Sequence, residues 1–303
     1  MSNSAVPFPS KVQIFWLAIR PKTLPASLSP VLLGTASVPF EQLNWLLVIC
    51  AFGCAVFLQI TVNLANDFFD AKNGVDSDQR LGPVRVTQSQ LASPMQMACG
   101  IVLFVLLSIL CGLVLIVYSD WLMLGVGVLC VLAALGYSGG PYPIASHGLG
   151  EIAVLIFFGW VAVMGSFYIQ TQSLNGQLFT LATALGLVLA AVMLVNNIRD
   201  IPTDRSAGKT TLAVRLGNKN SKVVFTGLFV VAAILHCLAF TAFTNDYPII
   251  LTTVPIVLCF PFAHKICSKM WISEGAALNP LLASTAQLSM LYSVSTSLLL
   301  LIY

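Results

Sequence analysis

Acidic and amide side chains crowd the end of an uncharged run near residue 63. The stretch NLANDFFDAKNGVDSDQR (63–80) follows LLVICAFGCAVFLQITV, which carries no charge. Four of its polar residues, at offsets of 0, 3, 4 and 7, fall on one face of an α-helix: Asn63, Asn66, Asp67 and Asp70. The residues that follow add further acids and nearby positive charge: Asp76, Asp78, Lys72, Arg80 and Arg85.

A second cluster repeats this pattern 133 residues further along the chain. In NNIRDIPTDRSAGKTTLAVRLG (196–217), Asn196, Asp200 and Asp204 are spaced by four residues, and Asn197 lies three residues before Asp200. Pro202 predicts that the helix bends or ends between the two aspartates. Basic residues follow in the same stretch: Arg205, Lys209 and Arg215.

The residue types in both clusters point to a metal and a phosphate. Carboxylate and amide oxygens suit Mg²⁺ or Ca²⁺, and Mg²⁺ commonly binds through one or two carboxylates together with substrate phosphates. Arg and Lys beside them can hold phosphate oxygens. A single aspartate at a helix end could be only a solvated cap, but clustered like charges need a cation or a basic partner. Acids alone would suit a cation pathway, whereas acids interleaved with Arg and Lys favour a metal-bridged diphosphate.

Membrane helices are the elements that must carry these clusters. The chain of 303 residues is 58% hydrophobic and only 8% charged, whereas a soluble domain is about a quarter charged. The net charge of +3 argues against a nucleic-acid partner. We expect residues 1–303 to form a single transmembrane domain after a polar N-terminal tail at 1–15. The predicted fold is an all-α integral membrane protein, with nine transmembrane helices in one bundle around a central cavity.

The nine predicted spans lie near residues 17–38, 44–66, 96–118, 121–137, 150–170, 178–198, 223–244, 247–263 and 283–302. Pro25 and Pro30 predict a kink or an earlier start for the first span. All fourteen lysines and arginines lie at the N-terminal end or near the loops after spans two, four, six and eight. The other loops carry Glu41, Asp120 and Asp246 and no basic residue. The positive-inside rule then predicts a cytoplasmic N-terminus, an external C-terminus, and both acidic clusters on the cytoplasmic side.

These motifs resemble those of the UbiA superfamily of intramembrane prenyltransferases. The resemblance rests on NDFFD at 66–70, on the later DxxxD from Asp200 to Asp204, and on the nine spans. Four segments are similar to the branch whose acceptor is 1,4-dihydroxy-2-naphthoate: RPKTLP (20–25), NLANDxxD (63–70), RLGPVR (80–85) and NNIRDxxxDxxxGKxTLAVRLG (196–217). The likeness runs from about Arg20 to the last span, and the long second motif is quite specific.

The resemblance implies a magnesium-dependent reaction at a bacterial inner membrane, with the active site on the cytoplasmic side. A polyprenyl diphosphate ionises to an allylic cation, the dihydroxynaphthoate ring attacks it, and the carboxylate leaves as CO₂ to give demethylmenaquinone. The implied Mg²⁺ ligands are Asp67, Asp70, Asp76, Asp200 and Asp204. The implied diphosphate and substrate contacts are Asn63, Asn66, Lys72, Arg80, Asn196, Asn197, Lys209 and Arg215. The implied catalytic residues are Asp67, Asp70, Asp200, Asp204 and Tyr137.

Some of these assignments keep an alternative. Tyr137-Ser138 matches a Tyr-Ser/Thr element of the family, and its ring could stabilise an allylic cation, but it could also be an interfacial aromatic. Many family members have a third aspartate four residues after NDxxD; here that position is Gly74 and the next acid is Asp76, which leaves the role of Asp76 open. Another aromatic acceptor, such as 4-hydroxybenzoate, is the alternative substrate. A divalent-cation or phosphate transporter is the alternative class.

Overall fold

A computed structural model describes residues 9–74, 81–82, 84–243 and 248–302, and these residues form helices and turns without a strand. The first half contains α1 (Lys11–Ile19), η1 (Pro21–Thr23), α2 (Leu24–Ala36), η2 (Phe40–Gln42), α3 (Trp45–Lys72), α4 (Pro94–Tyr118), α5 (Leu122–Gly136) and η3 (Ile144–His147). The second half contains α6 (Gly150–Val154), η4 (Leu155–Val161), α7 (Ala162–Thr171), α8 (Gly176–Arg199), α9 (Ile201–Ser206), α10 (Leu212–Ala242), α11 (Ile249–Thr252), α12 (Val254–Ile272), η5 (Gly275–Leu278) and α13 (Asn279–Ile302).

Seven helices in the described part of the chain are long and apolar enough to cross a membrane. They are 45–72, 94–118, 150–171, 176–199, 212–242, 249–272 and 275–302. The remaining two predicted spans are shorter elements. The span predicted at 121–137 is the 15-residue helix α5. The span predicted at 17–38 is divided, because α1 ends at Ile19 and Arg20 adopts a left-handed conformation with φ of 53° before η1 and α2 begin.

Prolines account for where several helices begin or break. Pro25 lies at the start of α2, where a missing backbone N–H costs little, and Pro30 lies inside α2. Helix α8 ends at Arg199 and α9 begins at Ile201, with Pro202 in its first turn, so the helix breaks at Asp200 itself, just before the point that Pro202 predicted. A glycine makes a similar break in α10, where Gly217 is non-helical with φ of 74°. The second acidic cluster therefore spans the junction of two helices.

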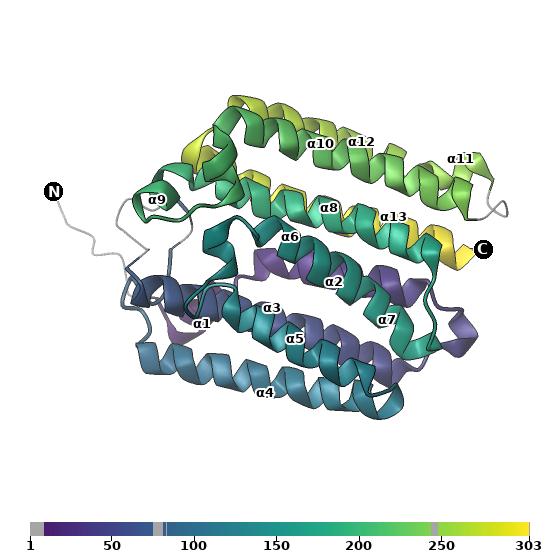
Figure 1. Cartoon of the computed structure of the whole chain (residues 1–303), viewed down its shortest axis with the longest axis horizontal. Helices are drawn as coiled ribbons and strands as arrows, with labels where there is room; N and C mark the ends of the chain where they lie inside the picture. The colour runs from purple at the N-terminus through teal and green to yellow at the C-terminus, as the bar shows by residue number, and fades with distance from the viewer. Residues whose placement is uncertain (1–8, 75–80, 83, 244–247, 303) are drawn as a thin grey trace.

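Helix α8 is the centre of the bundle, and its side chains dominate the largest buried core. It packs against α10 and α13, while α13 also packs against α2 and α12. In Figure 1, α10 and α12 lie at one edge of the molecule and α3, α4 and α5 lie at the other. Close backbone approaches hold the middle together: a Cβ atom added at Gly34 of α2 would lie 2.2 Å from the carbonyl oxygen of Val163 in α7.

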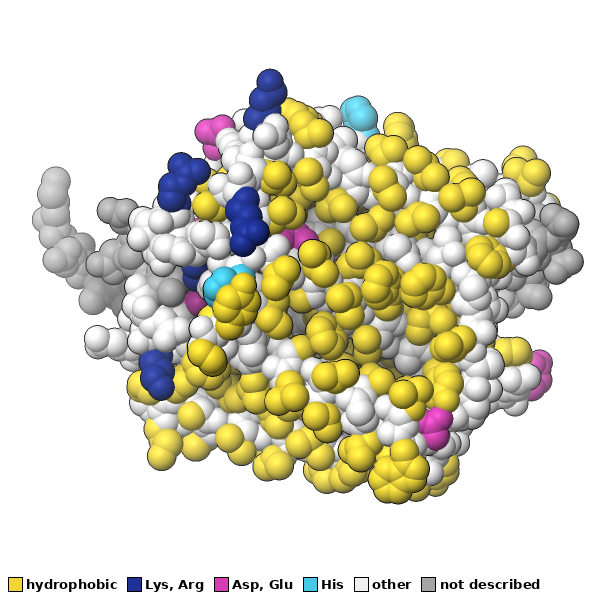
Figure 2. Space-filling model, viewed as in Figure 1, with side chains coloured by type: hydrophobic (Ala, Val, Ile, Leu, Met, Phe, Trp, Pro, Cys, Tyr) yellow, Lys and Arg dark blue, Asp and Glu magenta, His cyan; other side chains and the backbone are white. Residues whose placement is uncertain are grey.

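Basic side chains gather at one end of the bundle. On the face drawn in Figure 2, lysine and arginine side chains lie at the end where Figure 1 places α1 and α9, whereas acidic side chains lie at both ends. Hydrophobic side chains cover the surface between the two ends. The polar ends of α3 and α8 lie at the same end of the molecule as α9.

Candidate functional site

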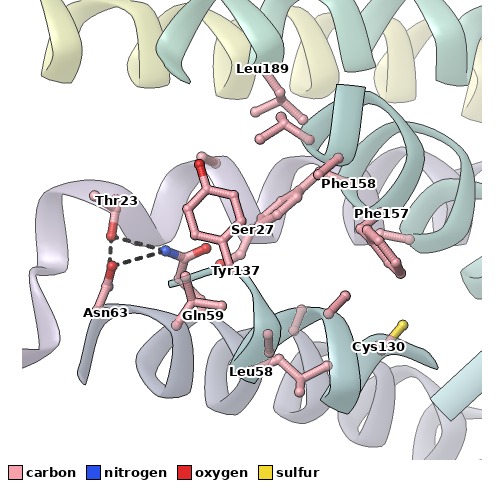
Figure 3. A pocket seen from close by; sticks show the side chains of 18 of the residues that line it. Thr23, Ser27, Leu58, Gln59, Asn63, Cys130, Tyr137, Phe157, Phe158 and Leu189 are labelled. Atoms are coloured by element: carbon pink, nitrogen blue, oxygen red, sulfur yellow. Dashed lines mark hydrogen bonds between the residues drawn. The ribbon is translucent and has the colours of Figure 1, made fainter. Parts of the chain in front are cut away.

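A cavity of about 1350 Å³ lies among the helices and reaches the polar end of the bundle. Eight charged side chains line it, three acidic and five basic: Asp70, Asp200, Asp204, Arg20, Lys22, Arg85, Arg199 and Lys209. The rest of its wall is largely apolar and includes Phe157 and Phe158 from η4. Figure 3 shows these two rings on one side and Tyr137 reaching between them and a polar group of Thr23, Gln59 and Asn63. The cavity thus joins a charged mouth to an apolar interior.

Asp70 at the end of α3 is the meeting point of the two sequence clusters. The Arg85 guanidinium donates to its Oδ2 atom at 2.9 Å, and the Lys209 ammonium lies 3.3 Å from its Oδ1 atom. Lys209 comes from the segment after α9, so this contact joins residues 139 positions apart. The prediction that Asp70 and Lys209 belong to one site is consistent with this geometry, and the predicted helix face explains why Asp70 points inward.

Asn63 and Asn66, which lie two turns and one turn before Asp70 on α3, also line the cavity. The Asn63 amide donates to the Ile19 carbonyl oxygen at 2.9 Å and to the Thr23 hydroxyl at 3.0 Å, and it accepts from Gln59 at 3.3 Å. Asn63 of α3 therefore binds both sides of the segment that separates α1 from α2, and Figure 3 shows its contact with Thr23. The Asn66 side-chain oxygen accepts from the Ser138 hydroxyl, next to Tyr137.

Asp67 lies on the same helix but has different surroundings. Its side chain is 1% exposed and does not contribute to the lining of the cavity. Both carboxylate oxygens accept backbone N–H groups, Oδ2 from Val86 and Oδ1 from Thr87, each at 2.9 Å. The two aspartates of NDFFD thus face different partners, and only Asp70 faces the cavity.

Asp200 ends α8 and is paired with its own neighbour. The Arg199 guanidinium donates to Asp200 Oδ1 at 2.8 Å and to Oδ2 at 2.6 Å. Arg199 is 2% exposed and also donates to Asn196 at 2.7 Å and to Asn279 at 2.8 Å. Arg199 had no role in the sequence prediction, although it stands between Asn197 and Asp200 in the quoted motif. Asn279 begins α13 within an apolar stretch, so the sequence offered no signal for it.

Asp204 lies one turn further, on α9, and lines the cavity. The pKa of its carboxyl group is raised to about 6, chiefly by burial; Lys209 and Arg199 lower this pKa, and the charges of Asp200 and Asp70 raise it. Burial and like charges both favour the neutral form of an acid. Asp204 is therefore the carboxylate of the three that is least offset by basic partners.

The three carboxylates of the cavity provide hard oxygen donors of the kind that Mg²⁺ prefers. Among the described residues, however, no group of three or more His, Cys, Asp or Glu side chains is close enough to hold a metal ion by itself. Guanidinium and ammonium groups stand between the acids, as the contacts of Asp70 and Asp200 show. The donor set fits a metal that completes its coordination with oxygens of a bound phosphate, which is how Mg²⁺ is usually held.

Two more predicted residues form a polar wall beside the charged mouth. Tyr137 follows α5 and lines the cavity, and its hydroxyl donates to the Met193 sulfur at 3.1 Å. Asn197 also lines the cavity and donates from Nδ2 to the buried Glu151 carboxylate at 2.8 Å. Sulfur is a weak hydrogen-bond acceptor, so the Tyr137 hydroxyl can exchange this contact for a stronger one with a ligand.

Other predicted site residues lie elsewhere. Lys72 is exposed and does not line the cavity. Arg215 does not line it either: its guanidinium donates to the carbonyl oxygens of Thr210 at 3.1 Å and His147 at 2.9 Å, which ties η3 to the segment before α10. Asp76 and Arg80 lie outside the described residues. Arg85, mentioned only as nearby charge in the sequence, is buried in the site.

The chain is similar to known proteins along most of its length. The model of the UbiA prenyltransferase family matches residues 27–291. The chain is 36% identical over 302 residues to the 1,4-dihydroxy-2-naphthoate octaprenyltransferase of Haemophilus influenzae, covering 96% of this chain and 97% of that protein. It is 40% identical over 220 residues to the protein of the same name from Escherichia coli, covering 70% and 71% of the two chains.

Solved structures share the fold at lower sequence identity. A UbiA homolog from Archaeoglobus fulgidus bound to DMAPP and Mg²⁺ aligns with a TM-score of 0.70 at 15% identity, over 95% of this chain and 99% of that one. The apo structure of a UbiA homolog from Aeropyrum pernix aligns with a TM-score of 0.68 at 16% identity, over 91% and 97%. With the family model matching most of its length, the chain belongs to the UbiA prenyltransferase family.

Proposed function

We propose that the protein transfers a polyprenyl group from its diphosphate to 1,4-dihydroxy-2-naphthoate, with loss of CO₂, to give the reduced, hydroquinone form of demethylmenaquinone. The observation that carries the proposal is the cavity, which joins a charged mouth of three carboxylates and five cations to an apolar interior. A prenyl diphosphate has this same division between a charged head and an apolar tail. Family membership and the names of the relatives from H. influenzae and E. coli support the reaction and the acceptor.

The diphosphate would bind at the charged mouth together with Mg²⁺. Asp70, Asp200 and Asp204 would hold the metal, and Asn66 and Asn196 add amide oxygens on the same lining. Arg85, Arg199 and Lys209 would hold phosphate oxygens by charge-assisted hydrogen bonds. When bound, Mg²⁺ supplies positive charge that stabilises the departing diphosphate.

The chain's own residues then act on the charge that develops during the reaction. The C–O bond of the donor breaks, a C–C bond to the aromatic ring forms, and the carboxylate of the acceptor leaves as CO₂. Preorganised cations at the mouth stabilise the diphosphate anion without reorientation during the step. The apolar walls exclude water, which would otherwise capture an allylic cation. Tyr137, Phe157 and Phe158 present aromatic groups to the same cavity, where ring faces attract a cation.

Membrane placement follows the same proposal. We infer that α2 and α5, although shorter than the seven long helices, complete a bundle of nine. The gathering of basic side chains around the end with α1 and α9 supports a cytoplasmic mouth and a cytoplasmic N-terminus in a bacterial inner membrane. The donor's tail would extend from the mouth into the apolar interior and the bilayer.

A transfer assay with matched controls tests the proposal. Membranes that carry the protein are given 1,4-dihydroxy-2-naphthoate, a labelled polyprenyl diphosphate and Mg²⁺, with EDTA as the metal control. We expect a prenylated naphthoquinone from the wild type, no product with EDTA, and a loss of about 100-fold or more in kcat for Asp70→Asn and Asp200→Asn. Glu41→Gln changes an exposed acid at the far loop and is expected to retain activity.

Two results would contradict parts of this assignment. Product with 4-hydroxybenzoate but none with the naphthoate would keep the mechanism and change the acceptor. Folded protein that transfers no prenyl group to any aromatic acceptor would exclude prenyl transfer. Metal or phosphate flux in vesicles made with such protein would favour a transporter instead.

A further inference from the structure

Asp67 is separated from the cavity by its own hydrogen bonds. It is 1% exposed, and each of its two oxygens accepts one backbone N–H, from Val86 and from Thr87, at 2.9 Å. A metal ion bound to this carboxylate would have to displace these bonds inside a buried site. Removing the acceptor from a buried N–H costs about 1–3 kcal/mol for each group. The position therefore suits an acceptor for backbone groups better than a metal ligand.

The backbone that Asp67 holds belongs to the turn that begins at Arg85. The Ser89 N–H donates to the Arg85 carbonyl oxygen at 3.0 Å, and the Leu91 N–H donates to the Val86 carbonyl oxygen at 3.0 Å. Val86 is fully buried and packs into the small core formed with α3 and α4. Asp67 thus binds the first two N–H groups of a compact turn, much as a capping residue does at a helix start.

Arg85 is the residue that this turn carries into the site. Its guanidinium is 6% exposed, lines the cavity, and donates to Asp70 at 2.9 Å. An arginine stays protonated in a protein. The place of its charge in the site therefore depends on where the backbone holds the residue. Asp67 and Asp70 therefore bind the same short segment from two sides, one through its backbone and one through its arginine.

We propose that Asp67 is a positioning residue and not a metal ligand: it holds the backbone of Val86 and Thr87 so that Arg85 reaches Asp70 and the diphosphate. This inference rests on the proposed function, because it assigns a role within the same site. Under this proposal the two aspartates of NDFFD have different roles: Asp70 contacts the ligands, and Asp67 holds the backbone of the turn at Val86 and Thr87. Loss of Asp67 then resembles loss of Arg85 rather than loss of Asp70.

The test compares metal and diphosphate binding, which require no acceptor and no turnover. The variants are Asp67→Asn, Val86→Pro, Arg85→Ala and Asp70→Asn. Val86→Pro removes the N–H that Asp67 accepts while the carboxylate stays, and proline is favoured at the second position of a turn. Binding of Mn²⁺, which can be followed by electron paramagnetic resonance, is measured at saturating inorganic diphosphate, and diphosphate affinity is measured separately.

We expect Asp67→Asn, Val86→Pro and Arg85→Ala each to weaken diphosphate binding by about tenfold or more, since one charge-assisted contact is lost or misplaced. All three should keep the wild-type amount of bound Mn²⁺ at saturating diphosphate, whereas Asp70→Asn should lose Mn²⁺. Asp67→Asn combined with Arg85→Ala should be no weaker than Arg85→Ala alone, because both act through one guanidinium.

Several outcomes would overturn the inference. Asp67→Asn that loses Mn²⁺ as Asp70→Asn does would make Asp67 a metal ligand. Losses that multiply in the double variant, or Arg85→Ala with unchanged diphosphate affinity, would disconnect Asp67 from Arg85. If Asp67→Asn does not fold, Val86→Pro and Arg85→Ala still decide the question. Failure of prenyl transfer in the wild type would contradict the proposed function and leave these binding results intact.

Discussion

At the scale of single residues, the three carboxylates of the cavity differ in how far they are already neutralised. Asp70 contacts Arg85 and Lys209, and Asp200 contacts Arg199. Asp204 has no such contact among the described ion pairs, and burial raises the pKa of its carboxyl group to about 6. Protonation of Asp204 therefore falls within an accessible pH range.

Metal affinity should follow the protonation of Asp204. Below pH 6 this carboxyl group is mostly neutral and a proton competes with the metal; above pH 6 it is charged and the competition ends. We expect the half-saturating Mg²⁺ concentration in the transfer assay to rise by up to about tenfold for each pH unit below 6 and to be constant above about pH 7. Asp204→Asn should lose this dependence and bind Mg²⁺ more weakly at every pH.

Glu41→Gln, which alters an exposed acid at the far end, should keep the wild-type profile. A Mg²⁺ requirement that does not change between pH 5 and pH 7 in the wild type would remove Asp204 from the metal site.

Helical spacing predicted part of the residue-level picture. The offsets of Asn63, Asn66 and Asp70 follow one helix face, and all three line the cavity. Helical spacing also predicted that Asp67 faces the cavity with these residues. Spacing along one helix carries no information about Val86, 19 residues away, whose N–H donates to Asp67. Arg215 was misleading for a similar reason: it stands in the motif, but its carbonyl acceptors come from Thr210 and from His147, 68 residues earlier.

At the scale of elements, small residues decide how closely the helices pack. In membranes, close approach through small residues replaces the hydrophobic effect as the source of helix association. Gly159 and Gly186 bring η4 against α8, where a Cβ atom at Gly159 would lie 2.9 Å from the Gly186 Cα atom. The same contact faces the π-helical turn that carries Phe157 and Phe158 into the cavity. Such turns often occur at functional sites.

Gly34→Ala tests this packing where it is tightest. The new Cβ atom would lie 2.2 Å from the Val163 carbonyl oxygen and 2.9 Å from the Ser166 Cβ atom, so α2 and α7 must separate. We expect a loss of about 1–3 kcal/mol of stability, seen as a lower melting temperature in detergent by tryptophan fluorescence. Gly125→Ala, with nothing within 4 Å of its added Cβ atom, should be neutral or slightly stabilising. Equal melting temperatures for the two variants would contradict the close approach.

The sequence predicted where long helices lie better than how they end. Uncharged runs identified all seven long helices, because a membrane-spanning helix needs about 20 apolar residues whatever its neighbours are. The first predicted span was divided because Arg20 adopts a left-handed conformation, which no hydropathy pattern encodes. The turn at Arg85 was also missed, since its geometry depends on Asp67 in another element.

At the scale of the whole molecule, the cavity extends from the charged mouth along α5 into the apolar part of the bundle. Gly127 of α5 lines it, and a Cβ atom there would meet nothing within 4 Å. Gly125, two residues away, is equally open but does not line the cavity. The pair therefore offers a variant that narrows the interior and a control that adds the same side chain outside it.

Gly127→Phe should shift the preference of the protein toward donors with shorter prenyl chains. We expect kcat/KM for a long polyprenyl diphosphate to fall by about tenfold relative to that for a short one, because the ring occupies space that the tail would fill. Gly125→Phe should leave this ratio unchanged. Product analysis with donors of two lengths measures both. An unchanged ratio in Gly127→Phe would place the tail along another wall of the cavity.

The pairing of acids and bases at the mouth has a consequence for the order in which ligands arrive. Asp70 is paired with Arg85 and Lys209, and Asp200 with Arg199, while the lining as a whole, with three carboxylates and five cations, carries a formal charge of +2. A lone Mg²⁺ must compete with a guanidinium for its carboxylate, and a lone diphosphate must compete with a carboxylate for its guanidinium. The two ligands together satisfy both sets, which predicts heterotropic cooperativity: each should raise the affinity for the other by the same factor, about tenfold or more, in calorimetric titrations. Lys209→Met should weaken that coupling and strengthen the binding of Mg²⁺ alone. The ion pairs of the empty site thus lower its affinity for either ligand when the other is absent.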